Sequence, residues 1–278
     1  METFIGGILL ISILVAVHEM WHLLIARDCG VGVESFSIGF GPGFMMFIWR
    51  GIPFYLRCIP LGGYVKLRQR NMPNSVSDGK CLEDATWRQK ILIFAAGAGF
   101  NLFLAVVLRT LMFWFAPAGT EARIFWFKVS FVPLLGPWYF APFLAIKTTF
   151  IAFAAYFVNA FLGIWFAIMP LIKTSPIAHG GVIGMIGLGA NAHAGFWSFC
   201  GLVYYCSVLL AAVNLLPLIP FDGGHIATTL TERIFGQGRF SRIFCGAIKW
   251  FGVVLIIILL INIVLSDLFD ILRYIYER

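Results

Sequence analysis

Charged residues are scarce in this sequence. Asp, Glu, Lys and Arg together make up 12% of the 278 residues, whereas hydrophobic residues make up 60% and the mean hydropathy is +0.91. A soluble domain is typically about half apolar and about a quarter charged. Most of this chain lies in apolar runs near or above ~18 residues, the length that crosses a bilayer as a helix. The composition therefore excludes a soluble globular protein and predicts a membrane protein with several helical spans.

Two further patterns are missing. The six cysteines form no C-x-x-C pair, which argues against a disulfide framework or a cysteine-based metal site. The basic residues, which give a formal net charge of +7, form no stripe with interleaved aromatic residues, which argues against a nucleic-acid partner. They cluster instead between apolar segments, as cytoplasmic loops of membrane proteins do. We therefore expect a lipid bilayer around this chain and no nucleic acid.

Four apolar segments are expected to be the core transmembrane helices. They cover about 4–26, 91–115, 197–218 and 250–271. The first is distinguished from a signal peptide by its acidic Met-Glu-Thr start and by the lack of an A-x-A pattern, so we expect a retained helix. Between Arg27 and Lys90, short β-favouring runs punctuated by Gly and Pro predict a small membrane-associated β element rather than helices.

The basic residues orient these helices. Eight Lys or Arg lie between Arg50 and Lys90, and four lie in an expected basic loop between Ile226 and Lys249, so both segments should be cytoplasmic. We expect one domain over 1–278, with a first half (1–116), an outer connecting segment (117–195) and a last part (196–278). Both termini should then lie on the outer side of the membrane.

The apolar stretch 140–172 does not fit a simple four-helix count. If the flanking helices keep their orientation, this stretch must start and end on the outer side of the membrane. It is then an interfacial or re-entrant helix rather than a lone fifth span. A pair of spans, with 124–135 contributing, is the alternative, and the sequence does not decide between them.

The strongest local signal is the H-E-x-x-H pattern formed by His18, Glu19 and His22 in the first helix. Residues i and i+4 lie on one face of a helix, so both imidazoles can reach one metal ion, and zinc suits imidazole nitrogen. Glu19 can accept a proton from a water molecule beside that metal. Ionisable residues inside membrane helices are functional candidates by default.

A catalytic zinc site needs a third protein ligand, and Asp222 is the obvious candidate. It lies in the stretch N-L-L-P-L-I-P-F-D-G-G-H (214–225), whose prolines and glycines break the third helix. The charge-based topology puts Asp222 at the same cytoplasmic depth as His18 and His22. His225, three residues further on, either contacts this site from outside the ligands or has a helix-capping or interfacial role.

These motifs resemble those of the site-2 protease family of intramembrane metalloproteases, and most closely the bacterial branch that cleaves an anti-sigma factor in sigma-E regulation. The resemblance rests on H-E-x-x-H in the first helix and N-x-x-P followed by D-G-G near the end of the third. Four further stretches fit that branch: E-S-F-S-I-G-F-G (34–41), I-P-L-G-G-Y-V-K (59–66), A-G-A-G-F-N (96–101) and G-V-I-G (181–184).

The resemblance implies a division of roles among these residues. It implies zinc (Zn2+) held by His18, His22 and Asp222, with Glu19 as general base. It also implies that the region 39–66 is β-structure that pairs with an unwound substrate, which β-strand addition explains physically. The substrate-binding residues that it implies are Asn101, Asn214, Gly62, Gly63 and Tyr64. The alternative for the two asparagines is a helix–helix hydrogen bond.

The sequence also departs from the family pattern. The connecting segment 117–197 has no room for the PDZ domains of related bacterial enzymes beside its apolar run, so we expect them to be lacking. Trp21 stands where a small residue is usual, and at i+3 from His18 its indole is expected to narrow the entrance to the site.

The sequence thus predicts a zinc-dependent endopeptidase that cuts a peptide bond in or near a substrate's transmembrane segment. Its partners would be single-span membrane proteins, such as an anti-sigma factor, in regulated proteolysis or membrane-protein quality control. Three alternatives stay open: another membrane H-E-x-x-H peptidase with Glu232 as third ligand, an inactive membrane scaffold, and a metal transporter. A transporter would show internal repeats and several polar helices, which this sequence does not.

Overall fold

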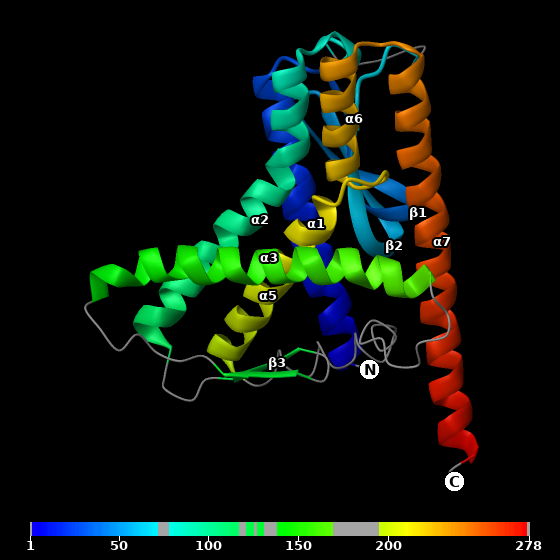
Figure 1. The fold of residues 1–278 in the computed structure, drawn as a ribbon. Coiled ribbons are helices and arrows are strands. Elements are labelled where there is room, and N and C mark those ends of the chain that lie inside the picture. Colours follow the sequence, from blue (N-terminus) through cyan, green and yellow to red (C-terminus); the bar gives the residue numbers. More distant parts are fainter. Residues whose placement is uncertain are drawn as a thin grey trace. The chain divides into compact units, whose positions relative to one another are not determined.

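The fold is seen in a computed structural model (Figure 1), which describes residues 2–71, 78–116, 121–124, 127–130, 138–168 and 195–276. The G-V-I-G stretch (181–184) of the sequence analysis lies outside these residues. The chain forms two compact units. One contains 9–102 and 214–249, and the other contains 1–8, 103–213 and 250–278.

Five helices in the described part of the chain are long and apolar enough to cross a membrane. They belong to α1 (Glu2–Asp28), α2 (Trp87–Phe115), α3 (Ala141–Ile168), α5 (Phe196–Asn214) and α7 (Arg239–Tyr276). The protein is therefore an integral membrane protein built mainly of helices. The expected count of four core helices is not confirmed, because α3 also meets the length and composition of a span.

Two helix boundaries correct the sequence-based expectations. The third expected helix ends at Asn214 rather than Leu218, because the turn that contains Pro217 and Pro220 begins at once. The expected basic loop after it is mostly helical, with α6 (Asp222–Phe235) followed directly by the start of α7. Its charges suggested a loop, but Ile226, Leu230 and Ile234 recur every fourth residue, which is a helical period.

The β element of the first unit consists of two long antiparallel strands, β1 (Val33–Trp49) and β2 (Ile52–Leu67). Both strands are sharply bent, so that the start of β1 lies between two parts of β2: Phe36 pairs with Phe54 and also with Val65. Positive φ angles at Gly39, Gly41 and Gly62 allow these bends. The segment 63–67 pairs only with the start of β1, so it forms one edge of the sheet. The expected hairpin structure is confirmed.

The sheet packs along α1. Phe36, Ile52 and Phe54 form a buried cluster with Leu23 and Ala26 of α1 and Ile93 of α2, among others. Toward the middle of α1, the Ser12 hydroxyl donates a hydrogen bond to the carbonyl oxygen of Pro60. In the other direction, five consecutive apolar residues of β1 are exposed: Phe44, Met45, Met46, Phe47 and Ile48. Contiguous exposed apolar side chains mark contacts with a membrane or another protein, which agrees with the expected membrane-associated β element.

In the second unit, α3 packs against α2 and α5. Ala141 and Ala145 contact Phe113 of α2, and Phe153 and Tyr156 further along α3 pack around Tyr204 of α5. Figure 1 shows α3 lying across the direction of α5 rather than along it. The strands β3 (Glu121–Ile124) and β4 (Phe127–Ser130) form a hairpin. The described part of 124–135 is therefore not the helix that the two-span alternative required.

Candidate metal centre

The turn between α5 and α6 places Asp222 as the first residue of α6. Two glycines make this turn possible. A Cβ atom on Gly223 would lie 2.2 Å from the carbonyl oxygen of Leu215, and one on Gly224 would lie 2.4 Å from the carbonyl carbon of Leu218. Both distances are too short for a real contact, so only glycine lets the turn close against the helix start. A carboxylate at a helix N-terminus is also stabilised by the helix dipole.

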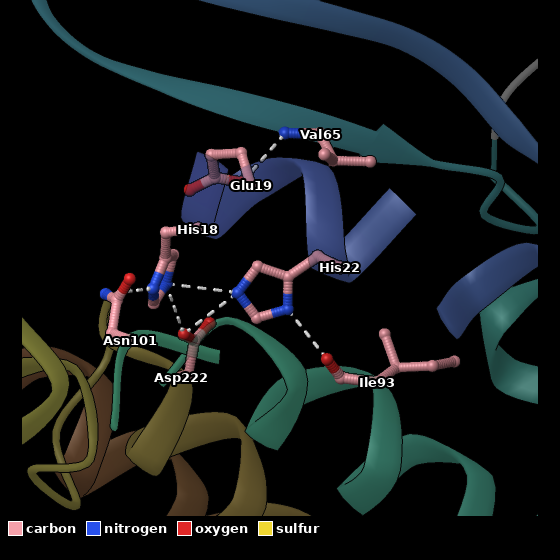
Figure 2. A network of polar contacts seen from close by, with 7 residues as sticks. All are labelled: His18, Glu19, His22, Val65, Ile93, Asn101 and Asp222. Carbon is pink, nitrogen blue, oxygen red and sulfur yellow. Dashed lines mark hydrogen bonds and ion pairs between the residues drawn. The ribbon is translucent and has the colours of Figure 1, made fainter. Parts of the chain in front are cut away.

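His18 and His22 lie on one face of α1 and meet Asp222 (Figure 2). The Nε2 atoms of the two histidines are 3.1 Å apart, and each is 3.1 Å from Oδ2 of Asp222. Four ligands placed tetrahedrally at about 2.0–2.1 Å from zinc lie roughly 3.3–3.4 Å from one another. The three donor atoms therefore fit three corners of a zinc site, and leave the fourth corner to water or substrate.

The second nitrogen of each imidazole contacts α2. Nδ1 of His22 lies 2.7 Å from the carbonyl oxygen of Ile93, and Nδ1 of His18 lies 3.0 Å from Nδ2 of Asn101. Asn101 is fully buried, and its Oδ1 has no hydrogen-bond partner among the described residues. Partners of this kind orient metal-binding histidines. Asn101, expected at the substrate, thus contacts a ligand of the candidate metal centre.

Gly97 of α2 also belongs to the candidate site, although the sequence pattern alone gave it no role. A Cβ atom there would lie 2.5 Å from Nε2 of His22 and 2.6 Å from Nε2 of His18. Any side chain would therefore occupy the space in front of the metal-binding nitrogens. The motif A-G-A-G-F-N contained this glycine, but its role depends on how closely α2 approaches α1.

Glu19 lies on the sheet side of α1, away from the two imidazole rings, as Figure 2 shows. Its Oε2 accepts a hydrogen bond from the backbone amide of Val65, at 3.2 Å. A Cβ atom on Gly63 would lie 3.7 Å from Cγ of Glu19 and 2.7 Å from the carbonyl oxygen of Ser37. The edge of the sheet therefore runs directly past the carboxyl group of Glu19.

The two groups of the site on α6 differ in charge. Burial acts to raise the pKa of Asp222, but hydrogen bonds to His18 and His22 outweigh it and hold the pKa at about 2. Asp222 is therefore a carboxylate at neutral pH, as a metal ligand must be. Burial lowers the pKa of His225, whose ring stacks on Phe94 at 4.7 Å between centroids. His225 thus packs as a neutral ring beside the site.

Trp21 lies on the opposite side of the histidine pair from Glu19. A helix turns by 100° per residue, so positions i+1 and i+3 from His18 point to different sides. The indole of Trp21 stacks on the ring of Phe100 in α2, with centroids 4.7 Å apart. The indole therefore fills the space between α1 and α2. It does not narrow the approach to the site from the sheet edge, which lies on the side of Glu19.

The remaining residues expected at the substrate are spread more widely. Asn214 is the last residue of α5, and no hydrogen bond in the described part of the chain joins its side chain to the metal centre. Gly62 has a φ of +115°, and a Cβ atom there would lie 2.9 Å from the ring of Phe40. Tyr64 stacks on that ring at 6.2 Å. Gly62 and Tyr64 therefore shape the bend of β2 that precedes the sheet edge, whereas Asn214 lies at the end of α5.

Comparison with known proteins gives consistent matches. A protein of Helicobacter pylori (strain ATCC 700392 / 26695) is 41% identical over 122 residues, which are 42% of this chain and 34% of that protein. A Brucella suis protein is 35% identical over 125 residues, 40% of this chain and 33% of the relative. A Vibrio cholerae protein is 36% identical over 118 residues, 40% and 25% respectively. All three names contain the words zinc metalloprotease.

The aligned part spans about a third of the length of these relatives or less, between 25% and 34%. The sequence profile of peptidase family M50 extends further and matches residues 6–260. This range contains the H-E-x-x-H helix, the folded strands and the turn that carries Asp222. The resemblance to site-2 proteases is thereby confirmed, and the chain belongs to peptidase family M50.

Proposed function

We propose that this protein is a zinc-dependent endopeptidase that hydrolyses a peptide bond in or near a substrate's transmembrane segment. The observation that carries the proposal is the triangle of donor atoms with 3.1 Å sides, formed by His18, His22 and Asp222. Glu19 follows the first of these residues directly and accepts a hydrogen bond from the Val65 amide at the edge of the sheet. Membership of a peptidase family supports the same reading.

The residues of the site would share the work as follows. His18, His22 and Asp222 hold zinc, which when bound polarises a carbonyl group and makes a water molecule more acidic. Glu19 accepts a proton from the attacking water and passes it to the nitrogen of the leaving amine. The Val65 amide keeps the carboxyl group of Glu19 oriented through their hydrogen bond.

The substrate would bind as an added strand. A transmembrane helix hides its carbonyl groups in hydrogen bonds from residue i+4 to residue i, so it must unwind before it is cut. Among the described residues, no strand pairs with the segment 63–67 on the side opposite β1, where the Val65 amide donates to Glu19. An unwound chain paired along this edge would have its backbone satisfied while it lies at the site. Gly62, Gly63 and Tyr64 shape this edge, and Asn214 is a further candidate contact.

The setting of the reaction is also part of the proposal. The basic residues of the segments 50–90 and 226–249 support a cytoplasmic position for both segments. Both chain termini would then lie on the outer side of a bacterial inner membrane. The quoted motifs support the branch that cleaves anti-sigma factors. Single-span membrane proteins are accordingly the proposed substrates, selected without a PDZ domain. The crosswise direction of α3 supports an interfacial rather than a spanning helix.

A test separates this function from a zinc-binding scaffold or a transporter. The full chain is co-expressed with a tagged single-span membrane reporter, as wild type, as Glu19→Gln and as Glu232→Gln. Removing the general base should lower cleavage about 10²–10⁴-fold while zinc stays bound. Glu232→Gln, which changes a carboxylate outside the site, should cut normally. Normal cleavage by Glu19→Gln, or loss of cleavage only in Glu232→Gln, would contradict the proposal.

A further inference from the structure

The two histidines of the metal centre are held by different kinds of partner. Nδ1 of His22 faces the carbonyl oxygen of Ile93, which can only accept a hydrogen bond. Nδ1 of His18 faces the side-chain amide of Asn101, which carries both a donor and an acceptor. This difference has a chemical consequence, because a neutral imidazole has one N–H and one lone pair.

His22 is fixed by its partner. The carbonyl group of Ile93 requires a proton on Nδ1, which leaves the lone pair on Nε2, inside the triangle of donor atoms. This is the tautomer that binds a metal through Nε2. The backbone of α2 therefore prepares the neutral ring of His22 for zinc, and a proton that Nε2 donates to Asp222 in the metal-free protein leaves when the ion binds.

His18 has no such fixed partner. With Nδ2 of Asn101 toward the ring, Nδ1 accepts the hydrogen bond, so the proton sits on Nε2 and faces Asp222. With Oδ1 toward the ring, Nδ1 donates and Nε2 offers its lone pair. Either orientation makes one hydrogen bond to His18. The other end of the amide is fully buried, and its oxygen has no partner among the described residues, so nothing there selects one orientation.

We propose that Asn101 is a positioning residue that holds His18 in the metal-binding tautomer by presenting Oδ1 to its Nδ1–H group. The amide has Nδ2 toward the ring when Nε2 of His18 donates to Asp222, and Oδ1 toward the ring when Nε2 binds the ion. Asn101 thus couples the orientation of its amide to occupation of the site. This inference rests on the proposed zinc-dependent function, and it assigns Asn101 to the metal rather than to the substrate.

The test measures zinc affinity rather than cleavage. Full-length protein carrying Glu19→Gln is titrated with zinc against a chelator of known affinity, alone and with a second change at Asn101. Asn101→Leu, similar in size but unable to accept a hydrogen bond, should lower the zinc affinity about 10–100-fold. Asn101→Asp, whose carboxylate only accepts, should rescue the affinity to within a few-fold of the parent protein.

Thr110→Val is the matched control, because Thr110 is also buried on α2 and, among the described residues, its hydroxyl group bonds only to the carbonyl oxygen of Val106. It should leave the affinity unchanged. Parent-like affinity in Asn101→Leu, or equal losses in the Leu and Asp variants, would overturn the inference while leaving the proposed function intact. Failure of the parent protein to bind zinc would instead remove the proposed function and this inference together.

A second measurement covers the case in which Asn101→Leu does not fold. Nitrogen NMR of the zinc-loaded parent protein with labelled histidine reports which ring nitrogen carries the proton. Protonated Nδ1 at His18, protected from exchange with solvent, is the expected result. An unprotonated Nδ1, or zinc bound through Nδ1, would overturn the inference.

Discussion

At the scale of single residues, the candidate metal centre requires a glycine at position 97, where any side chain would meet the two histidines. Gly97→Ala would place a methyl group 2.5 Å from Nε2 of His22 and 2.6 Å from Nε2 of His18. The backbone of a packed helix cannot easily retreat from such a clash. We expect Gly97→Ala to lose its bound zinc, as measured by metal analysis of the purified protein.

Gly99 provides the matched control for this prediction. It lies two residues further along the same helix, and a Cβ atom there would have nothing within 4 Å. Gly99→Ala should keep one zinc per chain and gain a little helix propensity. If both alanine variants bind zinc equally well, α2 does not approach the histidines as described.

Residue types and spacing predicted the candidate metal ligands but not their surroundings. His18, Glu19 and His22 could be identified because i and i+4 share a helix face whatever the rest of the fold is. The proximity of Asp222 to the two histidines, whose Nε2 atoms lie 3.1 Å from its Oδ2, was inferred from charge and topology. The roles of Gly97 and Asn101 could not be predicted, because they depend on the register between two helices far apart in the sequence.

At the scale of elements, the edge segment 63–67 connects the fold to the chemistry. The Val65 amide points away from β1 and toward Glu19, so a proline there removes that donor without breaking a β1–β2 hydrogen bond. A hydrogen bond to a charged group is worth about 1.5–3 kcal/mol. We expect Val65→Pro to cut a transmembrane reporter roughly tenfold more slowly or worse, with zinc content unchanged.

Val65→Ala is the control, since it shortens the side chain and keeps the amide. It should cleave at close to the wild-type rate. Equal rates for the proline variant and the alanine variant would show that neither the Glu19 contact nor the free edge matters for catalysis.

Some helices and strands could be predicted from the sequence more accurately than others. Long apolar runs located α1, α2 and α5 well, because length and hydropathy are local properties. The start of α7 and the whole of α6 were missed, because charge was weighed above the four-residue period of Ile226, Leu230 and Ile234. Gly and Pro located the bends in β1 and β2, but the double pairing of Phe36 is a long-range choice that no local pattern encodes.

At the scale of the whole molecule, apolar residues dominate the chain, and polar side chains gather at the candidate metal centre of the first unit. Charged and hydrogen-bonding groups are costly inside a bilayer and are retained there mainly for function. His18, His22 and Asn101 are buried and face one another, while large apolar side chains such as Ile13, Phe103 and Phe150 are exposed. That distribution agrees with a lipid environment around the exposed apolar side chains and with the proposed zinc site among the buried polar ones.

The central claim, that His18, His22 and Asp222 hold a catalytic zinc ion, is tested most directly by metal titration of the purified protein. The full chain is stripped of metal, reconstituted in lipid vesicles with a single-span reporter, and given increasing amounts of zinc. We predict no cleavage without metal, and full activity at about one equivalent of zinc, as expected for a single site with three protein ligands. Cleavage of the same bond by the metal-free protein would contradict the account.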